Sequence, residues 1–166
     1  MKKITDEISI RPVEDGDAIL LKKWLNDPKI LCWFPMINEI EIDDSIRIWM
    51  SYSKMGAGIT ALYNGKPCGM FNLYIQPFKK IAHNSLFSII VDEECRGRGV
   101  GKVLIEEGQK LAKDVFNISL LLLEVYEGNP ARRLYERMGF SCYAEQKHYV
   151  KEDGKYLSKF FMQKKI

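Results

Sequence analysis

The stretch from Leu86 to Lys102, LFSIIVDEECRGRGVGK, constrains the fold more than any other part of the chain. It begins with an apolar run, LFSIIV, whose β-branched, leucine and phenylalanine residues are typical of a buried strand. An acidic turn follows, and then glycines alternate with larger residues in GRGVG, residues 97–101, before a helical pattern begins. Glycine lets a backbone approach a ligand closely, and the N–H groups of a helix N-terminus bind anions. The stretch therefore predicts a strand, a diphosphate-binding loop and a helix.

Length and composition are those of an ordinary globular chain, and we expect one domain, 1–166. The net charge of +3 is too small to favour a nucleic-acid partner. The four cysteines are scattered and the histidines few, so we expect free thiols in a reducing cytoplasm and no bound metal. The N-terminus lacks an apolar secretion signal, and no apolar run approaches the ~20 residues of a membrane span. We therefore expect a cytoplasmic protein without a membrane partner. Whether the chain forms a homodimer is left open.

Hydrophobic periodicity predicts a series of strands and helices on both sides of this stretch. Asn64-Gly65 between two strand-like runs predicts a hairpin, and the aromatic segment 30–37 is expected to be an ordered loop. The expected strands are 7–11, 59–63, 68–75, 86–91, 119–126, 140–148 and 156–162, and the expected helices are 18–25, 43–54, 99–115 and 131–138. The order β-α-α-β-β-β-α-β-α-β-β predicts an α+β fold, a mixed α/β sandwich. Its sheet is mixed but mostly antiparallel, with about seven strands and about four helices.

Two common nucleotide-binding motifs do not fit the glycine run. A Walker A loop would end at Gly101-Lys102, but Arg96 replaces its first glycine and Val103 replaces the magnesium-binding hydroxyl. A dinucleotide fingerprint would place Lys102 or Leu104 at its third glycine. The run fits the pattern R-x-x-G-x-G instead, from Arg96 to Gly101.

This pattern resembles the acyl-CoA-binding loop of the GNAT superfamily of N-acetyltransferases. A second segment, LLLLEVYEGNPARRLYERMGF, is similar to the fifth strand, turn and fourth helix of that family. With the opening order of strands and helices, the resemblance covers nearly the whole chain. It implies the GNAT fold and an enzyme that transfers acetyl directly from acetyl-CoA to a primary amine, without a metal.

The resemblance also implies which residues bind acetyl-CoA. Backbone N–H groups of residues 98–102 would hold the diphosphate, and the end of strand 86–91 would pair with the pantetheine as an added strand does. Arg96 would order the loop and Lys102 would add a positive charge, although a solvated surface position suits either side chain equally. Asn129 would contact pantetheine, and it also suits a turn before a proline. The implied set is Ile90, Val91, Arg96, Gly97, Arg98, Gly99, Val100, Gly101, Lys102 and Asn129.

For the chemistry, the resemblance implies Tyr135 as the acid that protonates the CoA thiolate. Packing on CoA or in the core is the alternative for this tyrosine. The base is harder to assign, because strand 86–91 and its flank offer Ser85 and Ser88 but no carboxylate. Glu124 resembles the glutamate that acts as base in some protein N-terminal acetyltransferases. His83 or a chain of water molecules remains an alternative base.

The acceptor is expected between the segment joining the first two helices and the final hairpin. Trp33, Phe34 and Trp49 are candidates to line this pocket, although a position in the core is the preferred interpretation for Trp49. The acidic run between Glu39 and Asp44 would attract a cationic amine, or would only stabilise a helix N-terminus. The C-terminal segment loosely resembles relatives that acetylate free amino acids or similar amines. A small-molecule amine is therefore the preferred acceptor, ahead of a protein N-terminus. Two other functions are alternatives to the acetyltransferase: a catalytically silent acyl-CoA-binding module and an enzyme that uses a nucleotide triphosphate.

Overall fold

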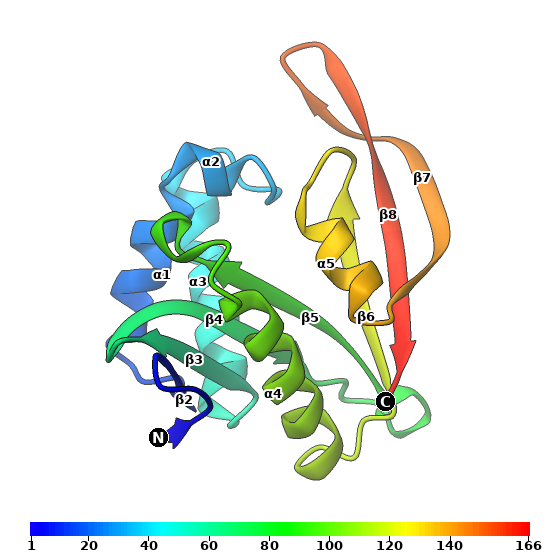
Figure 1. Cartoon of the computed structure of the whole chain (residues 1–166). Coiled ribbons are helices and arrows are strands. Elements are labelled where there is room, and N and C mark those ends of the chain that lie inside the picture. Colours follow the sequence, from blue (N-terminus) through cyan, green and yellow to red (C-terminus); the bar gives the residue numbers. More distant parts are fainter.

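The computed structural model describes all 166 residues, and one eight-stranded sheet runs through it (Figure 1). The strands are β1 (Lys2–Lys3), β2 (Ile8–Pro12), β3 (Gly58–Tyr63), β4 (Lys66–Tyr74), β5 (Asn84–Val91), β6 (Leu120–Tyr126), β7 (Ser141–Glu152) and β8 (Lys155–Lys165). Their spatial order is β1-β2-β3-β4-β5-β6-β8-β7, and β5–β6 is the single parallel pair. The expected α+β fold with a mostly antiparallel sheet is confirmed.

Five helices cover the two faces of this sheet (Figure 1). They are α1 (Asp17–Leu25), α2 (Pro28–Leu31), α3 (Glu39–Lys54), α4 (Val100–Asp114) and α5 (Ala131–Arg137), with short 3₁₀ turns η1 (Lys79–Ile81) and η2 (Glu93–Cys95). The first three pack on one face around a smaller apolar cluster, and α4 and α5 pack on the other around a larger one. No helix has the length and apolar character needed to cross a membrane.

The alternation of side chains along a strand explains these two apolar layers. On β5, Phe87 belongs to the cluster under α4 and α5, whereas Ile90 belongs to the cluster under α1 and α3. A glycine in α4 brings that helix unusually close to the sheet, since a Cβ at Gly108 would lie 2.5 Å from the ring of Phe71. The sheet is therefore buried on both sides in its central strands.

Several elements differ from the expectation in ways that local chemistry explains. The structure adds β1 and the single-turn helix α2, which the sequence pattern did not predict. Helix α3 begins at Glu39 rather than near residue 43, because the Asn38 side chain accepts from the Glu41 N–H at 3.0 Å. The Glu41 carboxylate in turn accepts from the Ile37 N–H at 2.7 Å. The predicted Asn64-Gly65 hairpin is confirmed, with positive φ angles of 48° and 78°.

The feature that positions the site is a gap in the middle of the sheet. Strands β5 and β6 pair only over Asn84–Leu86 and Leu120–Leu122. Beyond that point β5 stays paired with β4 up to Val91, while β6 stays paired with β8 up to Tyr126. Figure 1 shows the two strands meeting beside the C-terminus and then spreading apart. Each strand thus follows a different neighbour, and the space between them opens to both faces of the sheet.

Candidate active site

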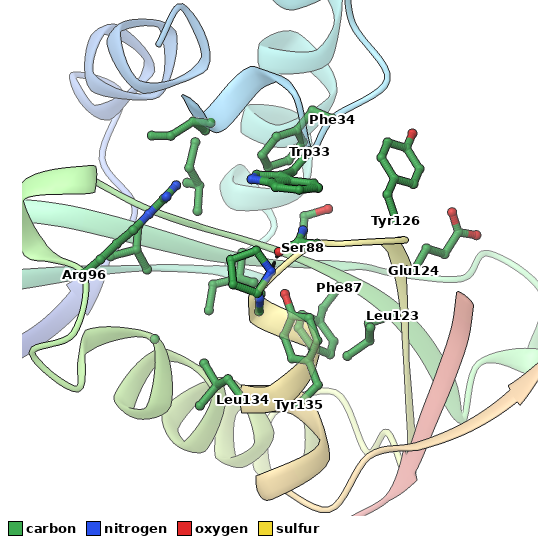
Figure 2. A pocket seen from close by; sticks show the side chains of 18 of the residues that line it. Trp33, Phe34, Phe87, Ser88, Arg96, Leu123, Glu124, Tyr126, Leu134 and Tyr135 are labelled. Atoms are coloured by element: carbon green, nitrogen blue, oxygen red, sulfur yellow. Dashed lines mark hydrogen bonds between the residues drawn. The ribbon is translucent and has the colours of Figure 1, made fainter. Parts of the chain in front are cut away.

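A cavity of about 980 Å³ occupies the gap between β5 and β6. Its wall comes from β5, β6, the glycine loop before α4, helix α5, the α2–α3 segment and the last two strands. Figure 2 shows Tyr135 and Leu134 on one side of the gap and Trp33 and Phe34 on the other. The cavity therefore has two sides, one under α4 and α5 and one under α2 and α3.

The glycine loop presents a row of free N–H groups to the first side. Gly97 and Gly99 have positive φ angles of 74° and 82°, a conformation that favours glycine, and Gly99 caps the N-terminus of α4. The Val103 N–H donates to the Gly99 carbonyl at 3.1 Å. No oxygen of the chain accepts from the N–H groups of residues 97–102. This loop and helix start together have the geometry that binds anions in other proteins.

Gly101 serves a different purpose from the other two glycines. Its φ is not positive, but a Cβ placed there would lie 3.1 Å from the Leu134 side chain. A glycine at this position therefore lets α4 pack closely against α5, and it leaves the start of α4 open toward the cavity.

The basic side chains of the loop point in different directions. Arg96 lines the cavity and is exposed (Figure 2). The guanidinium of Arg98 lies over the ring of Tyr63, 4.8 Å from its centre, and the residue does not line the cavity. Lys102 lines the cavity and its ammonium lies 3.7 Å from the Glu106 carboxylate. Of the implied donor residues, Arg98 can thus contribute its backbone but not its side chain.

The edge of β5 that faces the gap has no partner strand beyond Leu86. Alternate backbone N–H and C=O groups of residues 87–91 therefore point toward the cavity, as at any sheet edge. Ile90 is buried and Val91 half-buried, so both are held firmly in place. The free strand edge and the free N–H groups fit a ligand that carries both amide groups and a diphosphate, as acetyl-CoA does.

Tyr135 lies in α5 with its ring in the larger apolar cluster. The rings of Phe87 and Phe140 each lie 6.3 Å from it, edge to face. Burial raises the pKa of the Tyr135 phenol above its ordinary value, so the group keeps its proton to a higher pH than an exposed tyrosine does. Figure 2 shows the hydroxyl pointing into the cavity. The side chain can therefore donate a hydrogen bond to a group bound in the gap.

Glu124 lies on the other side of the gap. Its neighbours Leu123 and Val125 point into the cluster around Tyr135, so strand alternation places Glu124 on the opposite face of β6. Its carboxylate forms a salt bridge with Lys159 of β8. The side chain of Glu124 is 38% exposed, whereas that of Lys159 is 7% exposed. The residues implied as acid and base thus line one cavity from opposite faces of the sheet (Figure 2).

The second side of the cavity is aromatic. Trp33, Phe34 and Trp49 line it, and the Tyr74 and Ser88 hydroxyls are hydrogen-bonded to each other at 3.0 Å. Burial raises the pKa of Tyr74 above its ordinary value. The final strands add the side chains of Tyr126, Tyr149 and Lys159.

Sequence reasoning missed Tyr74, Tyr126, Tyr149 and Lys159 as residues of the cavity. The sequence pattern could have indicated that Lys159 is buried, because strand alternation puts it on the same face of β8 as Leu157 and Phe161. A lysine within an apolar stripe needs a local partner. The tyrosines gave no such signal, since aromatic residues are common in any strand.

The remaining residues predicted for the site either have another role or lie outside the cavity wall. Asn129 lines the cavity, but its side-chain oxygen accepts from the Ala131 N–H at 2.9 Å, which is a turn-forming role. His83 is exposed and lies outside the cavity wall. None of the acidic residues at the start of α3 lines the cavity, and Asp43 pairs with Lys22 at 2.7 Å. No group of three or more His, Cys, Asp or Glu residues is arranged to hold a metal ion.

Comparison with known proteins identifies the family of this fold. The model of the Acetyltransferase (GNAT) family matches residues 19–140. The L-amino acid N-acetyltransferase AaaT of Escherichia coli strain K12 is 25% identical in an alignment over 161 residues, which covers 94% of this chain and 96% of that protein.

Two solved structures share the fold over almost their full length. A Salmonella typhimurium protein, solved with its cofactor acetyl-CoA, superposes with a TM-score of 0.81 at 19% identity, over 96% of this chain and 94% of the other. A ribosomal-protein-alanine N-acetyltransferase from Brucella melitensis has a TM-score of 0.79 at 23% identity, over 95% and 99%. The chain therefore belongs to the acetyltransferase (GNAT) family and is an acetyl-CoA-dependent N-acetyltransferase.

Proposed function

We propose that this enzyme transfers acetyl from acetyl-CoA to the primary amine of a small molecule, an amino acid or a similar compound. The observation that carries this proposal is the two-sided cavity in the gap between β5 and β6. Tyr135 and the glycine loop lie on one side of this cavity, and the aromatic side chains of Trp33 and Phe34 lie on the other. The similarity to an L-amino acid N-acetyltransferase over 94% of the chain supports the choice of acceptor.

In this proposal the donor side holds acetyl-CoA through the backbone. The N–H groups of residues 97–102 bind the diphosphate, and the free edge of β5 at residues 87–91 pairs with the pantetheine amides. Arg96 and Lys102 add positive charge near the phosphates, and Asn129 contacts the pantetheine from the turn after β6. Acetyl-CoA supplies the thioester whose acetyl group moves to the acceptor.

The acceptor side prepares the amine for attack. A primary amine is an ammonium ion at neutral pH and must lose a proton before it can act as a nucleophile. Glu124 is the carboxylate of this cavity wall, and it takes that proton in our proposal. Tyr135, on the donor side, gives its phenolic proton to the departing sulfur and regains one from the attacking nitrogen, which loses its second proton as the amide forms. The two residues face the reacting atoms from opposite sides of the sheet.

A turnover assay with a panel of amines tests the proposal. The purified chain is mixed with acetyl-CoA and free amino acids, polyamines, aminoglycosides or N-terminal peptides, and thiol release is measured together with the mass of the product. We expect the enzyme to acetylate free amino acids with a higher kcat/KM than any of the peptides. Turnover confined to peptides would assign the enzyme to protein N-termini, and CoA binding without turnover on any amine would make it a silent module.

A further inference from the structure

Lys159 is a buried cation on the acceptor side of the cavity. It lies within β8, opposite Tyr126 of β6, and only 7% of its side chain is exposed. Burial alone lowers the pKa of its ammonium, but the contacts with Glu124 and Tyr149 outweigh burial and the net pKa is raised. Lys159 is therefore charged at neutral pH. A buried ammonium is stable only while an anion or another polar group compensates its charge.

The one carboxylate that compensates Lys159 is accessible from the cavity. Glu124 forms the only salt bridge of Lys159, and its own side chain is 38% exposed. Glu124 and Lys159 both line the cavity, so a ligand there lies beside the carboxylate and the ammonium together. Every other salt bridge of the chain lies between residues outside the cavity wall or, for Lys102 and Glu106, beside the glycine loop.

Two aromatic rings hold the Lys159 ammonium in place independently of Glu124. The ammonium lies 3.9 Å from the centre of the Tyr149 ring and 5.0 Å from that of Phe161. Such cation–π contacts are stronger for a desolvated cation. The ammonium can thus stay at the cavity wall when Glu124 changes partner.

We propose that Lys159 binds the carboxylate of the acceptor, so that the enzyme selects α-amino acids over amines that lack a carboxylate. This inference rests on the proposed function and specifies its acceptor. The wall of the cavity presents a negative and a positive charge in direct contact. An α-amino acid carries its ammonium and carboxylate on one carbon, so its two charges pair with Glu124 and Lys159 at the same time.

The exchange of partners also prepares Glu124 for proton transfer. When the acceptor carboxylate takes over Lys159, the Glu124 carboxylate is released from its salt bridge and faces the acceptor ammonium. One proton then passes from that ammonium to Glu124, and the exposed side chain returns it to solvent. An amine without a carboxylate leaves the Glu124–Lys159 pair intact, so it should bind weakly and also react slowly.

Acceptor analogues test this selection on the unmodified enzyme. The best α-amino acid substrates of the panel are compared with their primary amides and with the corresponding decarboxylated amines. The amide has a less basic amine and the decarboxylated compound a more basic one, so the pair brackets any effect of amine pKa. We expect kcat/KM to fall about 10- to 100-fold for both analogues, as for a lost hydrogen bond between charged groups.

Substitutions then identify the residue responsible. Lys159→Met should lower the preference for the amino acid over its amide to near one, without a matching rise in the KM for acetyl-CoA. Lys159→Arg should restore part of that preference, which a purely structural role would not predict. Lys155→Met, an exposed lysine at the start of the same strand, is the matched control and should keep the full preference.

The outcomes separate this inference from the proposed function. Turnover of amino acids with the same kcat/KM for their amides, or a preference that survives Lys159→Met, would overturn the role of Lys159 alone. Efficient acetylation of polyamines or aminoglycosides in place of amino acids would have the same consequence. Absence of turnover on every amine would overturn the small-molecule function itself, and the inference with it.

Discussion

Tyr135 combines an apolar environment with a hydroxyl that faces the cavity. Its ring packs edge to face against Phe87 and Phe140, which fixes the direction of the hydroxyl. Burial raises the pKa of the phenol, so the group stays protonated to a higher pH than a free phenol does. A donor that is held rigidly before the reaction needs no reorganisation when negative charge develops on sulfur.

Replacing Tyr135 by phenylalanine should therefore affect turnover more than binding. We expect Tyr135→Phe to lower kcat about 100-fold or more and to leave the affinity for CoA and the melting temperature close to those of the unmodified enzyme. Steady-state kinetics and calorimetric titration with CoA measure the two effects separately. Tyr63→Phe, on β3 and outside the cavity, is the control. An unchanged kcat would show that Tyr135 only packs.

At the scale of elements, our proposal places the acetyl-CoA diphosphate at the start of α4. Gly97 and Gly99 adopt positive φ angles, and the N–H groups of residues 97–102 have no acceptor within the chain. A Cβ at Gly99 would meet nothing within 4 Å. The open space beside Gly99 is the space that a diphosphate would occupy in our proposal.

A side chain with a negative charge in that space should block CoA. We expect Gly99→Glu to weaken CoA binding by a factor of about 100 or more, because it opposes at least two hydrogen bonds to charged oxygens, each worth about 1.5–3 kcal/mol. Isothermal titration calorimetry measures the loss. Gly65→Glu is a matched control, since Gly65 also has a positive φ, of 78°, and open space around it, but lies in the β3–β4 turn. Equal CoA affinity in the two variants would refute the diphosphate assignment.

The β5–β6 gap is a property of the whole molecule, because it forms where β5 pairs with β4 and β6 pairs with β8 instead of with each other. One wall belongs to the β4–β5 part of the sheet and the other to the β6–β8 part, and the two are paired only near the C-terminus. The long β7–β8 hairpin extends beyond the rest of the sheet and brings Tyr149 and Lys159 to the cavity (Figure 1). A ligand in the gap would thus contact both parts of the sheet.

Hydrogen exchange measures this effect across the molecule. Saturating CoA should slow exchange at the amides of residues 97–102 and at those of residues 87–91 that face the gap, by about 100-fold when the ligand concentration is 100 times its Kd. Amides of the exposed η1 turn, residues 79–81, should exchange at unchanged rates. Protection spread evenly over the chain, or absent from the glycine loop, would contradict the placement of the donor.

The expectations that came from local chemistry agree best with the structure. The α+β fold, the Asn64-Gly65 hairpin and the glycine loop before α4 depend on alternation, on positive φ angles and on helix starts, all of which involve residues close in the sequence. The roles of individual residues in binding and catalysis remain proposals. Helix α2 and strand β1 were not predicted, because elements of four and two residues are too short to show a period.

The sequence by itself determined the family, the glycine loop before α4 and the strand that precedes it, because the motif and the glycine conformations are local. Only the tertiary structure decided how the gap opens, since β5 and β6 separate by following different partners. It also decided that Glu124 and Tyr135 lie on opposite sides of one cavity. The pairing of Glu124 with Lys159 is likewise tertiary, because it joins residues of different strands through a register that no local pattern specifies.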